Sequence, residues 1–319
     1  MQMRFSIPIF LTSFLVFAQS HADNFAPEVL NPAPWCTGPL IAYNGVTAPP
    51  GSANIQTFFI SNKIFSPVNL YSLSPQLDIT VGLGQRFDLE VIGTYTFNSN
   101  SANNKRYNGF EDVDALLTFQ ALNAQDQAWW PALRVAVLET FPAGKYDQLD
   151  QGQLQADITG QGVYQTGLGA FFTKYYPLKA GRWLNTYLTL IYSLPASAHV
   201  SGLNSYGGSA DTDGTEENGG SFFADFALEL SLSKHWVLAN DISYTYDMSD
   251  NYHGALGVSQ QGASSDSSMP AMQVVSLAPA LEYNFNANLG IIAGAWFSVY
   301  EKNLNKFVAG IISLNYFTG

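Results

Sequence analysis

The two segments Asn288–Tyr300 (NLGIIAGAWFSVY) and Lys306–Phe317 (KFVAGIISLNYF) decide the fold of this chain. In the second segment, large apolar residues fall at even positions, at Val308, Ile312 and Leu314, and a mixed set of residues falls between them. A period of two residues is that of a β-strand, whose side chains alternate between two faces. Both segments therefore predict strands with one apolar face and one mixed face.

Twelve segments of this kind follow one another from Asn54 onward, with turn-forming residues between them. In chain order they are Asn54–Ser61, Pro75–Gly84, Arg86–Asn98, Phe110–Ala121, Pro131–Phe141, Gln161–Tyr176, Arg182–Leu194, Ser221–Ser233, Trp236–Met248, Ala271–Asn284, Asn288–Tyr300 and Lys306–Phe317. Short connections such as Pro177–Gly181 alternate with long ones such as Pro195–Gly220. Bacterial outer-membrane barrels have this arrangement, with short periplasmic turns and longer outer loops. We therefore expect an all-β fold, a transmembrane antiparallel β-barrel of about 12 strands over residues 54–319.

The composition of single segments also fits a barrel in a membrane. In the third segment Phe87, Leu89 and Val91 share one side, and Asp88 and Glu90 share the other, as lipid outside and water inside would require. Only 12% of all residues are charged and 14% are aromatic, which is apolar for an exported protein unless one surface meets lipid. The expected location is the bacterial outer membrane. The expected partners are outer-membrane lipid and the barrel-assembly machinery.

Residues Met1–Ala22 have the features of a secretory signal peptide. Arg4 supplies a positive start, Phe5–Phe17 is apolar but too short to span a bilayer, and small residues precede a cleavage site after Ala22. Removing Arg4 from the 13 basic residues leaves 12 against 25 acidic ones, so the mature chain carries a net charge of about −13. That charge argues against nucleic acid as a partner. The single cysteine, Cys36, cannot form a disulfide within the chain.

Residues 23–53 are rich in proline and have no sustained period, so they form a leader before the barrel rather than a domain. Two interpretations remain open for this leader. It is a disordered periplasmic tail, or it is a plug that folds into the lumen. Trp35, Leu40, Ile41 and Tyr43 favour the plug, because their side chains prefer cover to water.

Acidic residues dominate the side of the segments that would face the lumen. Alternation places ten charged residues there: Asp78, Asp88, Glu90, Asp112, Asp114, Arg134, Asp225, Glu229, Asp241 and Glu282. Arg134 is the one clear base in this set, so a pore of this composition should prefer cations or neutral solutes to anions.

A closer pair of acids is expected between the eighth and ninth segments. A tight turn around His235 would place Glu229 opposite Asp241. One carboxyl group of such a pair would hold its proton tightly, or the pair would bind a cation. Alternatively, both groups are hydrated in a wide lumen and have no specific role.

The long loops Ser201–Gly220 and Ser249–Pro270 offer little chemistry. The first contains Asp211–Glu217, which mixes acids with glycine, a composition that could bind calcium weakly. Its spacing is not that of an EF-hand calcium loop, so a solvated loop is favoured. We expect no metal, no cofactor and no enzyme activity. After the signal peptide, histidine occurs only in loops or a turn, at His199, His235 and His253, and no Gly-x-Ser-x-Gly motif is present.

A series of short motifs carries a family resemblance. In order they are Gly109-Phe110-Glu111-Asp112-Val113, Ala132-Leu133-Arg134-Val135-Ala136-Val137, Phe141-Pro142-Ala143-Gly144-Lys145, Thr159-Gly160-Gln161-Gly162-Val163, Leu194-Pro195, Leu232-Ser233-Lys234-His235-Trp236 and Ala278-Pro279-Ala280-Leu281-Glu282-Tyr283-Asn284-Phe285. Through them, from about Pro75 onward, the chain resembles the outer-membrane family named for the meta-cleavage pathway of phenol degradation, a group of transporter-like barrels. Pro142-Ala143-Gly144 departs from the Pro-Thr-Gly that is commoner in that family. The resemblance implies a passage for small hydrophobic or aromatic compounds and no catalytic residues.

We therefore expect an outer-membrane channel for passive uptake of small solutes, hydrophobic or aromatic ones included, through an acidic lumen. The alternative is a non-conducting surface barrel whose long outer loops bind a partner. A continuous water path would favour the channel, and a blocked lumen would favour the surface protein.

Overall fold

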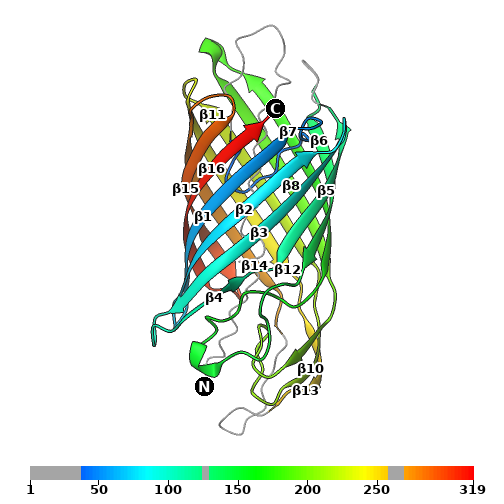
Figure 1. Cartoon of the computed structure of the whole chain (residues 1–319), viewed down its shortest axis with the longest axis vertical. Helices are drawn as coiled ribbons and strands as arrows, with labels where there is room; N and C mark the ends of the chain where they lie inside the picture. Colours follow the sequence, from blue (N-terminus) through cyan, green and yellow to red (C-terminus); the bar gives the residue numbers. More distant parts are fainter. Residues whose placement is uncertain (1–36, 124–128, 258–268) are drawn as a thin grey trace.

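The computed structural model describes residues 37–123, 129–257 and 269–319. The expected signal peptide, residues 1–22, and the first part of the leader, residues 23–36, lie outside these ranges. Within the described ranges the chain forms a cylinder of tilted strands, and two short 3-10 helices, η1 (Gln151–Gln153) and η2 (Lys179–Gly181), lie in its connections (Figure 1). No helix in the same ranges is long and apolar enough to cross a membrane.

Twelve antiparallel strands form the wall of the barrel. They are β1 (Ala53–Phe65), β2 (Leu70–Gly82), β3 (Phe87–Asn100), β5 (Val113–Leu122), β6 (Ala132–Phe141), β7 (Gln165–Pro177), β8 (Trp183–Pro195), β11 (Ser221–Ser231), β12 (Trp236–Asp247), β14 (Met272–Asn284), β15 (Leu289–Lys302) and β16 (Lys306–Thr318). Each strand pairs with its neighbours, and β1 pairs with β16 from Ala53 opposite Thr318 to Phe65 opposite Lys306. This last pairing closes the sheet, so the predicted fold class is confirmed.

The predicted segments all contain a wall strand, but some boundaries were wrong. The first hairpin is longer than expected, because β1 continues beyond Ser61 to Phe65 and β2 begins at Leu70 rather than at Pro75. Asparagine is common in turns, yet the side chain of Asn62 is buried on the inner face and continues the alternation. The opposite error occurs at β7, which begins at Gln165 and leaves the residues from Gln161 onward to a loop.

A β-bulge interrupts the wall strand after β3. The short strand β4 (Arg106–Phe110) pairs with the outer part of β3, and β5 pairs with the remainder, with a shift of one residue between the two registers. The backbone N–H of Glu111, at the bulge, donates to the carbonyl oxygen of Thr94 (3.0 Å). An extra residue in a strand reverses the alternation. Glu111 is therefore buried on the inner side, together with Asp112 and Asp114, which alternation had already placed there.

Parts of the long outer loops form a second sheet. Strands β9 (Ala198–Ser201), β10 (Asp213–Glu217) and β13 (Asn251–Ala255) pair in the order β13-β10-β9, at the end of the barrel opposite the C-terminus (Figure 1). The expectation of a solvated loop over Asp211–Glu217 is therefore wrong for residues 213–217. Backbone pairing on both edges of β10 fixes a stretch that its side chains alone would leave in water.

The outward faces of the wall strands are apolar, as predicted. Phe87, Leu89 and Val91 are exposed on the outside of β3, whereas Asp88 and Glu90 between them are fully buried. In a bilayer, every backbone group needs a partner within the protein, and a closed barrel supplies one. This outer surface is suited to contact with lipid.

The inner face changes character around the barrel. On one rung of paired residues Ala280, Gly294, Ile311 and Ile60 lie side by side on β14, β15, β16 and β1. The same rung continues on β2 with Ser74, whose hydroxyl group lies 2.9 Å from that of Thr96 on β3. Strands β2 and β3 also carry Asp78, Asp88 and Glu90 on their inner faces, so at this level the lumen has an apolar side and a polar side.

The position of β16 across the bilayer can be tested by placing a positive charge at two points on its outer face. Ile312, at the centre of β16, is 51% exposed, and Tyr316, near the periplasmic end, is 48% exposed. Ile312→Arg should lower the free energy of unfolding in lipid vesicles by about 2–4 kcal/mol, and Tyr316→Arg should lower it by about 0–1 kcal/mol. The difference arises because the cost of placing a cation against lipid falls towards the interface. Urea titrations of the two variants in vesicles measure both values. Equal costs at the two positions would contradict the placement of β16 across the bilayer.

Candidate functional site in the barrel lumen

One chain segment, Thr37–Ser52, lies inside the barrel, and it is called the lumenal segment below. It is hydrogen-bonded to six wall strands, β14, β12, β8, β7, β5 and β3. Leu40, Ile41 and Tyr43 at its centre are at most 1% exposed. Its contacts begin at Glu282 and end at Asp88, and both residues lie at the end of the barrel where the short turns are (Figure 1). The segment therefore crosses the periplasmic half of the lumen.

Asp241 on β12 makes the largest set of contacts with the lumenal segment. Its carboxylate accepts hydrogen bonds from three consecutive backbone N–H groups, those of Leu40 (3.2 Å), Ile41 (3.0 Å) and Ala42 (3.0 Å). These N–H groups are buried, so each needs an acceptor in place of water. A carboxylate is a strong acceptor, and here one side chain fixes a whole turn of backbone.

Two more carboxylates hold the two ends of the segment. Glu282 accepts from the N–H of Thr37 (2.5 Å), and Asp88 accepts from the N–H of Ala48 (2.8 Å). Three acids that alternation placed in the lumen are thus engaged with the protein's own backbone. That engagement was not part of the sequence prediction, which treated all of them as groups that meet solute.

Uncharged side chains complete the set, and sequence reasoning missed them because it considered charge alone. Thr189 accepts from the N–H of Tyr43 (2.8 Å), and Thr173 accepts from that of Gly45 (2.7 Å). Gln120 accepts from the N–H of Thr47 (2.7 Å) and donates to the carbonyl oxygen of Gly45 (2.8 Å). All three wall residues are buried at inward positions. Their inward position in the alternating pattern was the signal that could have identified them from the sequence.

Arg134 is packed against the lumenal segment rather than exposed to a pore. Its guanidinium lies 3.2 Å from Asp88, and its central carbon lies 5.0 Å from the ring centre of Phe171 and 5.9 Å from that of Tyr43. Tyr43 and Phe171 are themselves stacked, with ring centres 4.4 Å apart. The one inward base of the prediction is therefore paired with an acid and covered by two aromatic rings.

Two glycines allow the lumenal segment to lie close to the wall. A Cβ atom on Gly45 would lie 2.6 Å from the backbone nitrogen of Thr173 and 2.8 Å from the carbonyl oxygen of Phe171. A Cβ atom on Gly82 of β2 would lie 1.9 Å from the carbonyl oxygen of Pro49. The neighbouring backbone atoms cannot move far enough to accept a Cβ atom, so the fit requires glycine at both positions.

The structure describes all ten residues that alternation predicted on the inner face. Nine of the ten are buried, and Asp114 is half-buried. The expected pairing of Glu229 with Asp241 is wrong, because Glu229 lies opposite Ala239 and Asp241 lies opposite Ala227. The turn between β11 and β12 sets a register two residues away from the assumed one, so the two acids are diagonal neighbours.

Glu229 has partners of its own. Tyr187 donates its hydroxyl group to Glu229 (2.5 Å), and the side-chain amide of Asn185 donates at 3.2 Å. The alternative of two freely hydrated acids is therefore also wrong, since one binds wall side chains and the other binds the lumenal segment.

Asp112 holds an outer loop and does not stand free in the lumen. Its carboxylate accepts from the backbone N–H groups of Ala143 (3.0 Å), Gly144 (2.9 Å) and Gln161 (2.8 Å). These groups belong to the connection between β6 and β7, whose residues 156–161 are buried. Tyr206 from another outer loop donates its hydroxyl group to the carbonyl oxygen of Gln161 (2.8 Å). Two outer loops therefore pack against each other and against the wall near the outer mouth.

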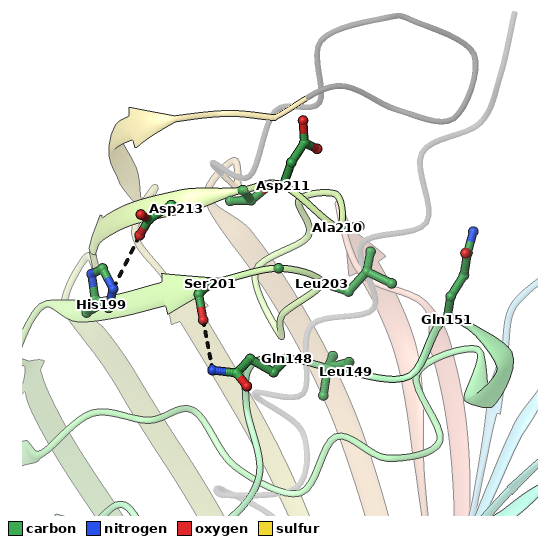
Figure 2. Close-up of a pocket in the computed structure, with 11 residues that line it drawn as sticks. Gln148, Leu149, Gln151, His199, Ser201, Leu203, Ala210, Asp211 and Asp213 are labelled. Carbon is green, nitrogen blue, oxygen red and sulfur yellow. Dashed lines mark hydrogen bonds and ion pairs between the residues drawn. The ribbon is translucent and has the colours of Figure 1, made fainter.

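The outer loops also form an open pocket of about 670 Å³. Its lining comes from the β6–β7 connection, β9 and the residues before β10 (Figure 2). Figure 2 shows His199 directed at Asp213, 3.4 Å away, and Gln148 directed at Ser201, 3.2 Å away. The lining is polar on one side and carries Leu149 and Leu203 on the other.

The three histidines of the described residues lie in the outer loop sheet or in a turn. No cluster of three or more His, Cys, Asp or Glu side chains in these ranges could hold a metal ion. His199 and His253 lie on the exposed loop sheet beside Asp213 and Glu217, each pair 3.4 Å apart. His235 lies in the β11–β12 turn and contacts the carbonyl oxygen of Asn284.

Comparisons with known proteins agree with this architecture. No protein-family model matches the chain, and no curated protein matches its sequence. Among solved structures, an outer membrane channel from Pseudomonas putida F1 superposes with a TM-score of 0.62 at 15% identity, over 85% of this chain and 97% of that one. The chain has the fold of an outer-membrane β-barrel. At this identity the similarity concerns the fold alone, so the resemblance to the meta-cleavage family stays a prediction.

More distant barrels also superpose. The translocator domain of the autotransporter NalP from Neisseria meningitidis gives a TM-score of 0.43 at 13% identity, over 83% of this chain and 88% of that one. The toluene transporter TodX of Pseudomonas putida gives 0.38 at 12% identity, over 85% and 89%.

The packing of the lumenal segment against the wall can be tested at Gly45. In a chain with Cys36→Ser and Ala42→Cys, the new thiol replaces a side chain that is fully buried. Adding Gly45→Val should displace the segment, because overpacking costs about 1–3 kcal/mol. Labelling by a membrane-impermeant thiol reagent should then accelerate roughly ten- to hundredfold.

The matched control for this experiment is Gly93→Val, since a Cβ atom on Gly93 would meet nothing within 4 Å. It should leave the labelling rate unchanged. Equal labelling rates in the Gly45 and Gly93 variants would show that the segment does not depend on this contact.

A second test concerns Asp250, in the loop before β13. It accepts a hydrogen bond from the N–H of Gly219 (2.8 Å), and burial raises its pKa from 3.8 to about 6. A carboxyl group with a raised folded pKa binds its proton more tightly when folded. The loop should therefore lose stability as the pH rises from about 4 to about 6, with no further loss above that range.

Asp250→Asn should remove this dependence and slow amide exchange in β10 and β13 at pH 7. We expect an effect on the order of 1–3 kcal/mol in the free energy of local opening. Hydrogen exchange at pH 4 and pH 7 measures it, and an unchanged pH dependence in the variant would contradict the assignment.

Proposed function

We propose that this protein is an outer-membrane channel for passive movement of small solutes, closed in this conformation by the lumenal segment. One observation carries the proposal. From Thr37 to Ala48, the hydrogen bonds that the segment's N–H groups make to the wall end on side chains, whereas wall strands bond to one another through their backbones. The segment can therefore leave the lumen without unpairing any wall strand.

The acceptors would then line an open path. Removal of the segment exposes Asp241, Glu282 and Asp88, which now hold its backbone. A twelve-stranded barrel lies between small filled barrels and wide porins, so its lumen is narrow and close to these groups. The ten predicted residues include nine acids and one base, and this supports passage of cations and neutral solutes over anions.

Two similarities support the choice of a channel. The barrel of Pseudomonas putida F1 that shares this fold is itself described as an outer membrane channel. The motifs of the meta-cleavage family favour small hydrophobic or aromatic solutes, and the apolar side of the lumen at Ile311, Gly294 and Ile60 suits such molecules.

A non-conducting surface barrel is the second candidate. The lumen is crossed by the lumenal segment, and such a blocked lumen favours this candidate. The ordered sheet β9-β10-β13 and the adjacent pocket of about 670 Å³ also favour it, since both lie where an external partner could reach them. The two candidates differ in one measurable property, which is the flow of ions.

Conductance of the refolded mature protein in a planar bilayer tests the proposal. The intact chain should be nearly silent, and deletion of residues 37–48 should produce stable open steps with cation preference in a salt gradient. Pro49–Ser52 are kept because Gly51 bonds to Gly82 on β2. In the deleted chain, Asp241→Asn should weaken the cation preference, because one carboxylate of the lumen is lost.

Thr57→Asn, a change on the exposed outer face of β1, is a control that should not alter selectivity. A correctly folded barrel that stays silent after the deletion would contradict the channel and favour the surface protein.

A further inference from the structure

The lumenal segment shows what kind of molecule this lumen can bind. It presents backbone N–H donors to acidic and hydroxyl side chains, and it presents apolar side chains to the wall. Leu40 illustrates the second contact, because its Cδ1 atom lies 2.5 Å from where a Cβ atom of Gly294 would be. A competing ligand would need the same two properties, hydrogen-bond donors and an apolar body.

Asp225 is a carboxylate at the edge of the segment for which the described residues supply no hydrogen-bond partner. Asp225 on β11 is 1% exposed, and neither of its oxygens has a hydrogen-bond partner in the described part of the chain. Its paired neighbours are Thr189 on β8 and Ser243 on β12. Thr189 already accepts from the N–H of Tyr43 in the lumenal segment, so Asp225 lies at the edge of that segment.

The nearby donors are engaged elsewhere. The hydroxyl group of Ser243 lies 2.5 Å from that of Ser276, which also accepts from the indole N–H of Trp296 (2.6 Å). Strands β8, β11, β12 and β14 contain no Lys, Arg or His residue that could pair with Asp225. A buried carboxylate without a donor is costly, so this position is suited to a donor brought by a ligand.

Two buried apolar side chains lie directly beside this carboxylate. Phe223 shares the inner face of β11 two residues away, and it is paired with Ile191 on β8. Both side chains are at most 2% exposed. Along the barrel axis they lie nearer to the outer loops than Asp225 does, because β11 runs from the outer loops towards the short turns. Asp241, a diagonal neighbour of Asp225 across β11 and β12, adds a second negative charge.

We propose that this inner wall binds amphipathic organic cations, in which a primary ammonium group is attached to an aromatic or alkyl body. The inference rests on the proposed channel function and names its solute class. The ammonium group donates to Asp225 in the field of Asp241, and the apolar body lies against Phe223 and Ile191. Anionic aromatic compounds are repelled by the two carboxylates, and uncharged ones lack the charge that this position is suited to neutralise.

Isothermal calorimetry with the full mature protein in detergent tests the site, using benzylammonium as the probe. Benzyl alcohol, benzoate and methylammonium serve as comparisons that lack the charge, reverse it or lack the ring. Benzylammonium should bind at least about tenfold more tightly than each of them, as expected for one charged hydrogen bond or one buried ring.

Variants separate the two halves of the site. Asp225→Asn should weaken benzylammonium binding about tenfold. Phe223→Ala should weaken benzylammonium but leave methylammonium unchanged. Asp213→Asn, which changes a carboxylate on β10 whose side chain is 71% exposed, should leave every affinity unchanged. Heat-modifiable migration on gels confirms that each variant retains the barrel.

Equal binding of benzylammonium and benzyl alcohol would overturn the inference, as would unchanged binding in a folded Asp225→Asn variant. Calorimetry needs no ion flow, so it is independent of the conductance experiment. Binding with the expected pattern by a barrel that stays silent after deletion of residues 37–48 would overturn the channel and support the site. Conduction without selective binding would do the reverse.

Discussion

Closure of the wall between β1 and β16 is the constraint on which the rest of this structure depends. Inside a bilayer no water is available to the edge of a sheet, so an open edge would leave a row of backbone groups without partners. The pairing from Ala53 opposite Thr318 to Phe65 opposite Lys306 removes that edge. Once the wall is complete, its backbone groups are satisfied by the wall itself, and only side chains remain to act on the lumen.

This division explains how the protein can hold a chain segment in its own lumen. The carboxylate of Asp241 takes three consecutive N–H groups, and Thr189, Thr173 and Gln120 take others further along. Each of these bonds ends on a side chain, so residues 37–48 add no backbone pairing to the wall. Stability of the wall and occupancy of the lumen are thus separate properties, and a mutation can change one without the other.

The acids of the lumen are less uniform than their shared position implies. Asp241 and Glu282 bind the lumenal segment, whereas Asp112 binds an outer loop and Glu229 binds Tyr187. For Asp225, as for Asp78 and Glu90, the described chain supplies no hydrogen-bond donor. Residues on the same face of the same fold therefore differ in what they can still bind, and this difference distinguishes structural acids from those available to a solute.

The sequence by itself determined the fold class, the number of wall strands and the inward placement of the ten charged residues. It could do so because alternation is a local property, set by the pleat of each strand and readable within about ten residues. Only the tertiary structure decided the register of β11 on β12, the bulge that turns Glu111 inward and the contacts of Thr37–Ser52. These features join residues as many as 245 positions apart, and no periodicity in the chain records which distant group meets which.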